Sequence, residues 1–125
     1  MSEKREVRGA DVSSPIAQIR LDGADMPLKF DLNAFRVAED IYEIEYGRDL
    51  NFARIITQLS AGKLGAVMAV LYGALVSAAK DRGEKPMTWA EYAGKFRLES
   101  IPGVTEMLME KVAEAMPEAG GKNPQ

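Results

Sequence analysis

The chain lacks two residue types on which much protein chemistry depends: its 125 residues include no cysteine and no histidine. Without cysteine there is no disulfide, no thiolate zinc site and no catalytic thiol. Without histidine the commonest general base and metal ligand is missing, together with the nucleophile pairs that histidine completes. We therefore expect no cofactor, no metal site and no enzymatic activity. The absence of thiols is compatible with a reducing cytoplasm.

The chain also lacks a block of positive charge. Its 16 Lys and Arg residues face 19 Asp and Glu residues, which gives a net charge of -3. A protein that neutralises a run of phosphates needs clustered basic side chains. We therefore expect no nucleic-acid partner.

No apolar run reaches the length of about 20 residues that crosses a bilayer. The longest run, residues 64–79, is uncharged between Lys63 and Lys80, and much of it is alanine and glycine. It suits the central helix of a soluble bundle. Residues 1–15 carry charges and no apolar core, so they do not resemble a signal peptide. We expect no membrane association.

Local patterns predict a hairpin followed by helices. Ile19 and Leu21 alternate with polar residues, Asp22 and Gly23 supply a turn, and apolar residues alternate again up to Phe30. Helical periodicity and capping residues then mark residues 32–46, a short segment after Asn51, residues 64–79, a segment after Thr88, and a last segment from Pro102 to Met116.

These patterns predict a mainly α fold, a small helical domain of about five helices with an N-terminal β-hairpin packed on it. We expect this single domain to span residues 16–117. Residues 1–15 should form a flexible arm, and the polar, Gly- and Pro-rich residues 118–125 a disordered tail.

The helix predicted over residues 32–46 is amphipathic. At about 100° per residue, one apolar stripe comprises Ala34, Val37, Ala38, Ile41 and Ile44, with Phe35, Tyr42 and Tyr46 along one edge. The opposite, solvated face carries Arg36, Glu39, Asp40 and Glu43, and Arg36 and Asp40 are spaced as an i,i+4 ion pair.

Glu45 differs from the other carboxylates because it projects into the apolar sector near the helix C-terminus. The macrodipole and burial both disfavour a negative charge there. One interpretation is a local pair with Arg48 or fraying of the helix end, and another is that Glu45 lines a partner surface. A catalytic acid acting with Tyr42 or Tyr46 is a third, for which no second catalytic group or substrate is in view.

Small residues recur at every fourth position of the predicted central helix, at Gly65, Ala69, Gly73 and Ser77. Such a row lets another helix approach closely. The neighbour is either a helix of the same chain or a second copy, in which case the row is a self-association face.

The clearest local motif is a capping box formed by Thr88 and Glu91. The helix that it starts carries Trp89, Tyr92 and Phe96. Aromatic side chains of this kind either fill a core or contact a partner, because aromatics are enriched in the interface residues that contribute most to binding. We name Glu45, Trp89, Tyr92 and Phe96 as candidate partner-binding residues.

The order of segments resembles a known family. A hairpin ends in LKFDLNAF, a helix closes with EIEYG, a long helix contains YGALVSAA, and MTWAEYAGKF precedes a last helix. From about Ile16 to Met116 this order is similar to the tail assembly chaperones of long-tailed phages, including the versions found in prophages and gene transfer agents.

The resemblance implies binding without turnover. Members of this family bind the tape measure protein, keep it soluble and assist assembly of the tail tube around it. It implies two partners, the tape measure protein and the tail tube protein, a place in the host bacterial cytoplasm, and absence from the mature virion. An alternative keeps the fold but makes the protein a structural or adaptor subunit of the tail, forming a homo-oligomeric ring through the small-residue row.

Overall fold

The computed structural model describes residues 16–47, 51–97 and 101–115. The predicted arm, the predicted tail and Arg48 lie outside these residues. The described chain forms a two-stranded hairpin followed by five helices, which confirms the predicted mainly α fold with its hairpin at the N-terminal end of the domain.

The hairpin consists of β1 (Ile16–Leu21) and β2 (Ala24–Lys29), paired antiparallel. Leu21 pairs with Ala24, so the connection is a two-residue turn. Asp22 and Gly23 both have positive φ, 53° and 85°, the combination that a type I′ turn requires. Ile19, Leu21 and Leu28 are buried, and this face of the hairpin packs on the helices.

Helix α2 (Leu32–Tyr46) begins and ends at predicted residues. The Asp31 carboxylate accepts a hydrogen bond from the Ala34 amide at 2.9 Å, and Gly47 closes the helix in the left-handed region. The predicted apolar stripe is wrong at one end, because Ile44 is 73% exposed. The buried residues are instead Ala34, Phe35, Ala38 and Tyr42. The burial is turned toward the aromatic edge because α4 packs on that side.

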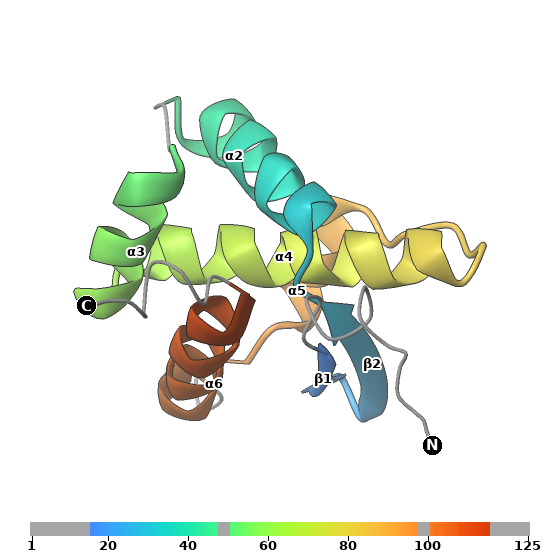
Figure 1. Ribbon diagram of the computed structural model, residues 1–125. Helices are drawn as coiled ribbons and strands as arrows, with labels where there is room; N and C mark the ends of the chain where they lie inside the picture. Colours follow the sequence, from blue (N-terminus) through green and yellow to red (C-terminus); the bar gives the residue numbers. More distant parts are fainter. Residues whose placement is uncertain (1–15, 48–50, 98–100, 116–125) are drawn as a thin grey trace, which may run out of the picture.

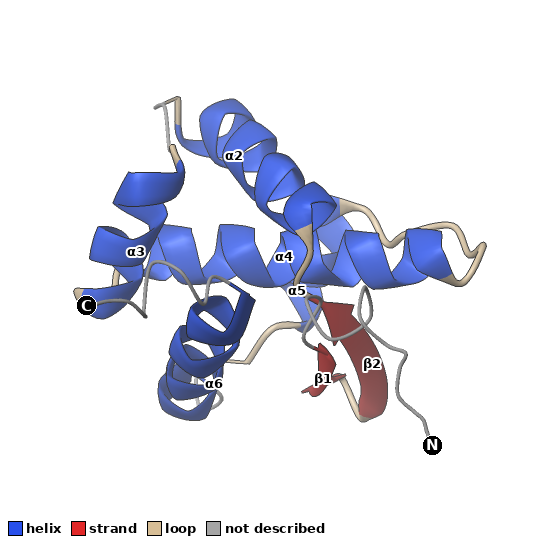
Figure 2. Ribbon diagram, in the orientation of Figure 1, coloured by secondary structure: helices blue, strands red, loops and turns tan. Residues whose placement is uncertain are grey.

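The remaining helices are α3 (Phe52–Ser60), α4 (Leu64–Asp81), α5 (Trp89–Lys95) and α6 (Ile101–Ala115). Figures 1 and 2 show α4 crossing the centre, with α2 above it, the hairpin and α6 below it, and α3 at its N-terminal end. Elements β2, α2, α3, α5 and α6 each pack against α4, and β1 packs against β2 and α6.

Helix α4 is buried almost all round, as expected for a central helix. By length and composition alone it could cross a membrane, and it is the one helix of the described chain that passes this test. However, 67% of this 18-residue helix is buried inside the fold, as is typical of the core helix of a globular domain.

Helices α2 and α4 meet at the small-residue row. A Cβ built on Gly73 would overlap the carbonyl oxygen of Ala34 on α2. At the N-terminal end of the row, Gly65 lies under the rings of Tyr42 and Tyr46. The two backbones can cross this closely only because α4 has no side chain at residue 73.

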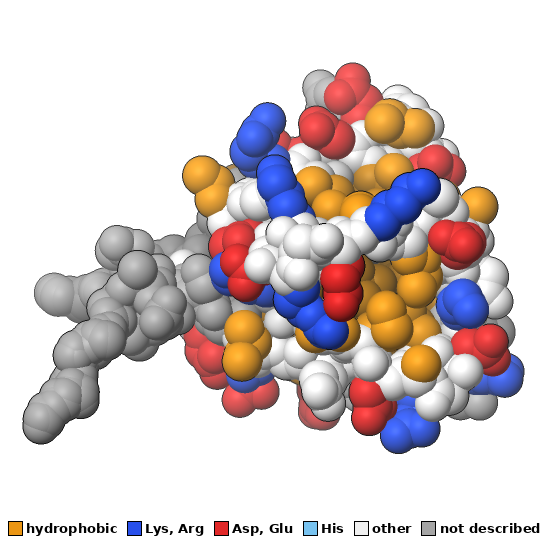
Figure 3. All heavy atoms as spheres, turned by 90° about the vertical axis from the view of Figure 1, so that its right-hand side faces the viewer, with side chains coloured by type: hydrophobic (Ala, Val, Ile, Leu, Met, Phe, Trp, Pro, Cys, Tyr) orange, Lys and Arg blue, Asp and Glu red, His pale blue; other side chains and the backbone are white. Residues whose placement is uncertain are grey.

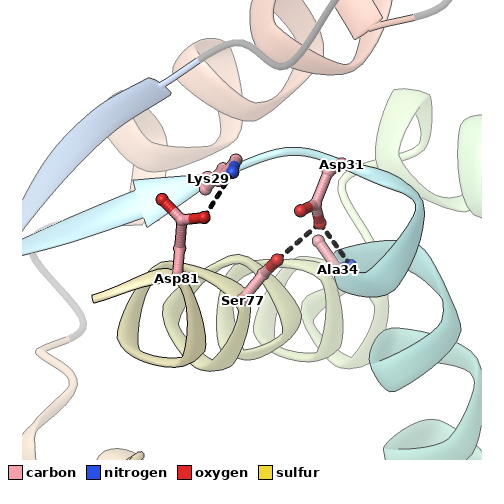
Figure 4. Close-up of polar contacts among 5 residues, drawn as sticks. All are labelled: Lys29, Asp31, Ala34, Ser77 and Asp81. Carbon is pink, nitrogen blue, oxygen red and sulfur yellow. Dashed lines mark hydrogen bonds and ion pairs between the residues drawn. The ribbon is translucent and has the colours of Figure 1, made fainter. Parts of the chain in front are cut away.

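Polar contacts hold the crossing where the start of α2 meets the C-terminal part of α4 (Figure 4). The Ser77 hydroxyl donates to the Asp31 carboxylate at 2.5 Å, and the same carboxylate oxygen caps α2. Beside it, the Lys29 ammonium pairs with the Asp81 carboxylate at 2.9 Å. The end of β2 and the start of α2 are thus fixed to the C-terminal half of α4.

The small-residue row therefore packs against α2 of the same chain, which was one of the two predicted neighbours. Ala69, Gly73 and Ser77 are buried and Gly65 is half-buried. The alternative that this row is a self-association face is corrected by this position, because a second copy could reach the row only after α2 had been displaced.

We predict that Gly73→Ala destabilises the fold. Overpacking a core costs about 1–3 kcal/mol, partly offset by the helix propensity of alanine, which is worth about 1 kcal/mol. Gly94→Ala in α5 is the matched control, because nothing lies within 4 Å of a Cβ built there. Urea denaturation should show a loss for Gly73→Ala and no loss for Gly94→Ala. A Gly73→Ala protein as stable as the unaltered one would contradict the close crossing.

Candidate functional site

The capping box starts α5, as predicted, and sets the position of Trp89. The Thr88 hydroxyl accepts from the Glu91 amide at 3.1 Å, and the Glu91 carboxylate accepts from the Thr88 amide at 3.0 Å. This reciprocal pair satisfies two backbone donors at the helix start. Trp89, the first residue of the helix, is thereby held at a defined place beside α4.

Two tyrosine hydroxyls attach this region to α4. Tyr92 is fully buried, and its hydroxyl donates to the Met68 carbonyl oxygen at 2.8 Å. The Tyr72 hydroxyl, from α4, donates to the Met87 carbonyl oxygen at 2.8 Å, just before α5 begins. Each bond joins a ring of one segment to the backbone of the other, so α5 is tied to α4 from both sides.

Six aromatic rings, five from α2, α4 and α5 and one from Phe96 directly after α5, form one connected group, which we call the aromatic cluster. From Trp89, ring centroids lie 5.4 Å from Tyr72, 5.4 Å from Tyr92 and 6.3 Å from Tyr46. Tyr46 in turn lies 4.9 Å from Tyr42, and Tyr92 lies 6.0 Å from Phe96. These spacings fall in the range in which tilted and edge-to-face ring pairs are favourable. The cluster comprises Tyr42, Tyr46, Tyr72, Trp89, Tyr92 and Phe96.

The cluster is buried at its centre and open at its ends. Tyr92 is fully buried, Tyr72 and Tyr42 nearly so, whereas Trp89 and Phe96 are half-buried and Tyr46 is 41% exposed. The structure thus brings the predicted residues Trp89, Tyr92 and Phe96 together. Tyr92 is corrected from a contact residue to an anchor, because its side chain has no exposed surface with which to touch a partner.

Sequence reasoning named Tyr46 only as a possible catalytic partner of Glu45 and missed it as a residue of the contact surface. Tyr42 and Tyr46 are one turn apart on the edge of α2, a spacing that indicates a shared face. That signal could have grouped these two rings, but nothing local shows that α5 would bring Trp89 against Tyr46.

Glu45, the fourth predicted residue, is exposed and lies beside the open end of the cluster. The carboxylate of Glu45 acts electrostatically on the Tyr46 hydroxyl. Burial is the main cause that raises the pKa of the Tyr46 hydroxyl above 10.0, and the negative charge of Glu45 adds to the shift. At neutral pH Tyr46 is therefore a neutral ring next to a carboxylate.

Apolar side chains outside the cluster are exposed as well, at Ile16, Leu32, Ile44 and Leu64. Figure 3 looks onto the C-terminal end of α4 and shows apolar side chains on both sides of the charged loop that protrudes at its centre. Among the described residues, no group of three or more Asp or Glu side chains is arranged to hold a metal ion.

The chain was compared with protein families, curated proteins and solved structures. No protein-family model, no curated protein and no solved structure matches the chain.

We predict that Tyr92→Phe lowers the free energy of unfolding by about 1 kcal/mol, the usual net worth of one hydrogen bond. Tyr46→Phe is the matched control, because among the described residues the Tyr46 hydroxyl has no hydrogen-bond partner. It should leave stability unchanged in the same urea titration. Equal losses in the two variants would show that the Met68 carbonyl is not the partner that matters.

We also predict that stability falls as the pH rises above 10. Burial raises the pKa of Tyr92 above 10.0, with a smaller contribution from Tyr46, and burial does the same for Tyr72. The unfolded chain releases these protons near pH 10 whereas the folded chain keeps them, so alkali favours unfolding. For one such group the fall is at most about 1.4 kcal/mol per pH unit.

Urea titrations at several pH values check this, and Tyr92→Phe should flatten the alkaline fall because one of the linked groups is gone. If the variant and the unaltered protein lost stability in parallel, Tyr92 would not be one of the buried groups that drive the effect.

Proposed function

We propose that this protein is a phage tail assembly chaperone that binds the tape measure protein without turnover. Two observations support this proposal. The order of its sequence segments resembles that family, and the aromatic cluster ends in an open surface where Tyr46 is 41% exposed beside half-buried Trp89. The second observation carries the proposal, because a chaperone must offer apolar surface to its client.

The chemistry of the surface fits a helical client. Trp and Tyr supply large contact area at low cost in side-chain entropy, and both are over-represented among residues that dominate binding energies. A long, largely helical tape measure protein presents amphipathic stretches, which bind by laying their apolar positions against such a surface. Covering those stretches keeps the client from aggregating.

In this proposal the chaperone acts in the host bacterial cytoplasm. It hands the tape measure protein to tail tube subunits and is absent from the mature virion. The ring-forming alternative loses the surface on which it was based, since α2 covers the small-residue row. Mass spectrometry of purified particles separates the two functions, because a ring subunit would be present at a fixed copy number and a chaperone would not.

We predict that Trp89→Ala weakens the complex with the tape measure protein by about 30-fold or more, the effect expected when a dominant interface residue worth about 2 kcal/mol is truncated. Co-expression should show the consequence directly: the unaltered protein raises the soluble yield of the tape measure protein, and the variant does not. Tyr46→Ala should act in the same direction, and it removes a more exposed ring with less risk to the fold.

Ile16→Ala is the control, because Ile16 is 69% exposed on β1 and is not part of the cluster. Circular dichroism and thermal unfolding of each variant establish that it is folded. The proposed function fails if the unaltered protein does not rescue the soluble yield of its cognate tape measure protein. The assigned surface fails if Ile16→Ala and Tyr46→Ala weaken the complex equally.

A further inference from the structure

One line of residues runs along α2 toward the open end of the aromatic cluster. Leu32, Glu39 and Tyr46 are spaced seven residues apart, so they lie nearly in line on one side of the helix. Both ends of the line are exposed apolar side chains, Leu32 at 77% and Tyr46 at 41%, and Glu39 between them is half-buried. At 1.5 Å per residue the line is about 21 Å long, or close to four helical turns.

Negative charge borders this line. Glu43 follows Glu39 by one turn and precedes Tyr46 by three residues, so it lies on the same side of the helix. Helix α2 carries four carboxylates, those of Glu39, Asp40, Glu43 and Glu45, against the single cation of Arg36.

None of these carboxylates is in an ion pair with a described residue. The ion pairs of the described chain lie within the hairpin, between the hairpin and the C-terminal ends of α4 and α5, directly after α4, and on α6. They do not include the predicted pair of Arg36 with Asp40. A partner that covered Leu32 and Tyr46 would desolvate Glu39 and Glu43 on the same side of the helix, which is costly unless the partner supplies positive charge.

The same charges indicate which partners do not fit. A second copy that presented the same side of its own α2 would bring Glu39 and Glu43 with one cation, Arg36, and the net like charge in contact is unfavourable. Nucleic acid and an anionic lipid surface carry the same sign of charge. The remaining fit is a partner that combines apolar side chains with lysine or arginine.

We propose that the partner segment that docks along Leu32, Glu39 and Tyr46 is an amphipathic helix of about four turns with lysine or arginine beside its apolar positions. This inference rests on the proposed function, and it defines the part of the tape measure protein that the chaperone holds. The apolar ends supply the contact area, and the carboxylates select a basic client over an acidic one.

Trp89 allows a direct measurement. It is the only tryptophan of the chain, and its ring lies 6.3 Å from that of Tyr46. The probes are two designed amphipathic peptides of about 18 residues that lack tryptophan. Both carry leucine at every seventh position. The positions that flank these leucines are lysine in one peptide and glutamate in the other, and the peptides are otherwise identical.

Each peptide is titrated into the intact protein, and binding is followed by the fluorescence emission of Trp89. At low salt the lysine peptide should bind at least about tenfold more tightly than the glutamate peptide, because several exposed charge pairs each contribute modestly. Raising the salt from about 0.05 to about 0.5 M should shrink this difference, because it screens exposed charges. Replacing both Glu39 and Glu43 by glutamine should weaken binding of the lysine peptide by about threefold to tenfold.

The control protein replaces Glu106 and Glu110 by glutamine, two exposed carboxylates on α6 that remove the same net charge elsewhere. It should bind the lysine peptide as the unaltered protein does. Equal affinity for the two peptides, a control that weakens binding as much as the α2 variant, or no change in Trp89 emission with either peptide would each overturn the inference.

Co-expression separates this inference from the function on which it rests. If the protein rescues the tape measure protein but binds both peptides equally, the function stands and the basic-helix inference is wrong. If the lysine peptide is preferred but the tape measure protein is not rescued, the surface selects basic helices and the proposed function is wrong.

Discussion

The close crossing of α2 over α4 at Gly73 determines where the other aromatic and charged side chains lie. The backbone of α2 approaches so closely that a single added Cβ would overlap the Ala34 carbonyl oxygen. This crossing fixes which side of α2 is buried, and hence that Tyr42 and Tyr46 turn toward Gly65 and α5. The bond from Ser77 to Asp31 and the pair of Lys29 with Asp81 set the position of α2 along α4. A wider crossing would leave Tyr46 away from Trp89, and the open end of the cluster would not exist.

Some rings of the aromatic cluster anchor α5, and others form exposed surface. The hydroxyls of Tyr92 and Tyr72 donate to backbone carbonyls of the neighbouring segment and hold α5 on α4. Trp89 and Tyr46 then stand at the edge with part of each ring in water. Rigid aromatic side chains lose little entropy on binding, so an edge already fixed from beneath is prepared for contact. The carboxylates of α2 lie beside this edge and give it a charge preference.

The sequence predicted the local structure well because its signals are local. Asn51 and the pair of Thr88 with Glu91 cap the helices that they were expected to cap, α2 spans the predicted residues 32–46, and the turn at Asp22 and Gly23 joins the two strands. The face that α2 buries was predicted less well. Periodicity gave the stripe that ends in Ile44, but contact with α4 decides burial, and a short pattern contains no information about the angle of that crossing. For the same reason, Trp89, Tyr92 and Phe96 could be named but not sorted into anchor and edge, and Tyr46 was missed.

In the proposed function, the client lies on the edge formed by α2 and α5. Hydrogen exchange of the protein, alone and bound to the tape measure protein, locates the contact, because amides under a docked helix exchange more slowly. A client docked there should slow exchange along α2 and around Trp89, with α6 unchanged. Protection confined to α6 or to the hairpin, with α2 and α5 unaffected, would contradict it.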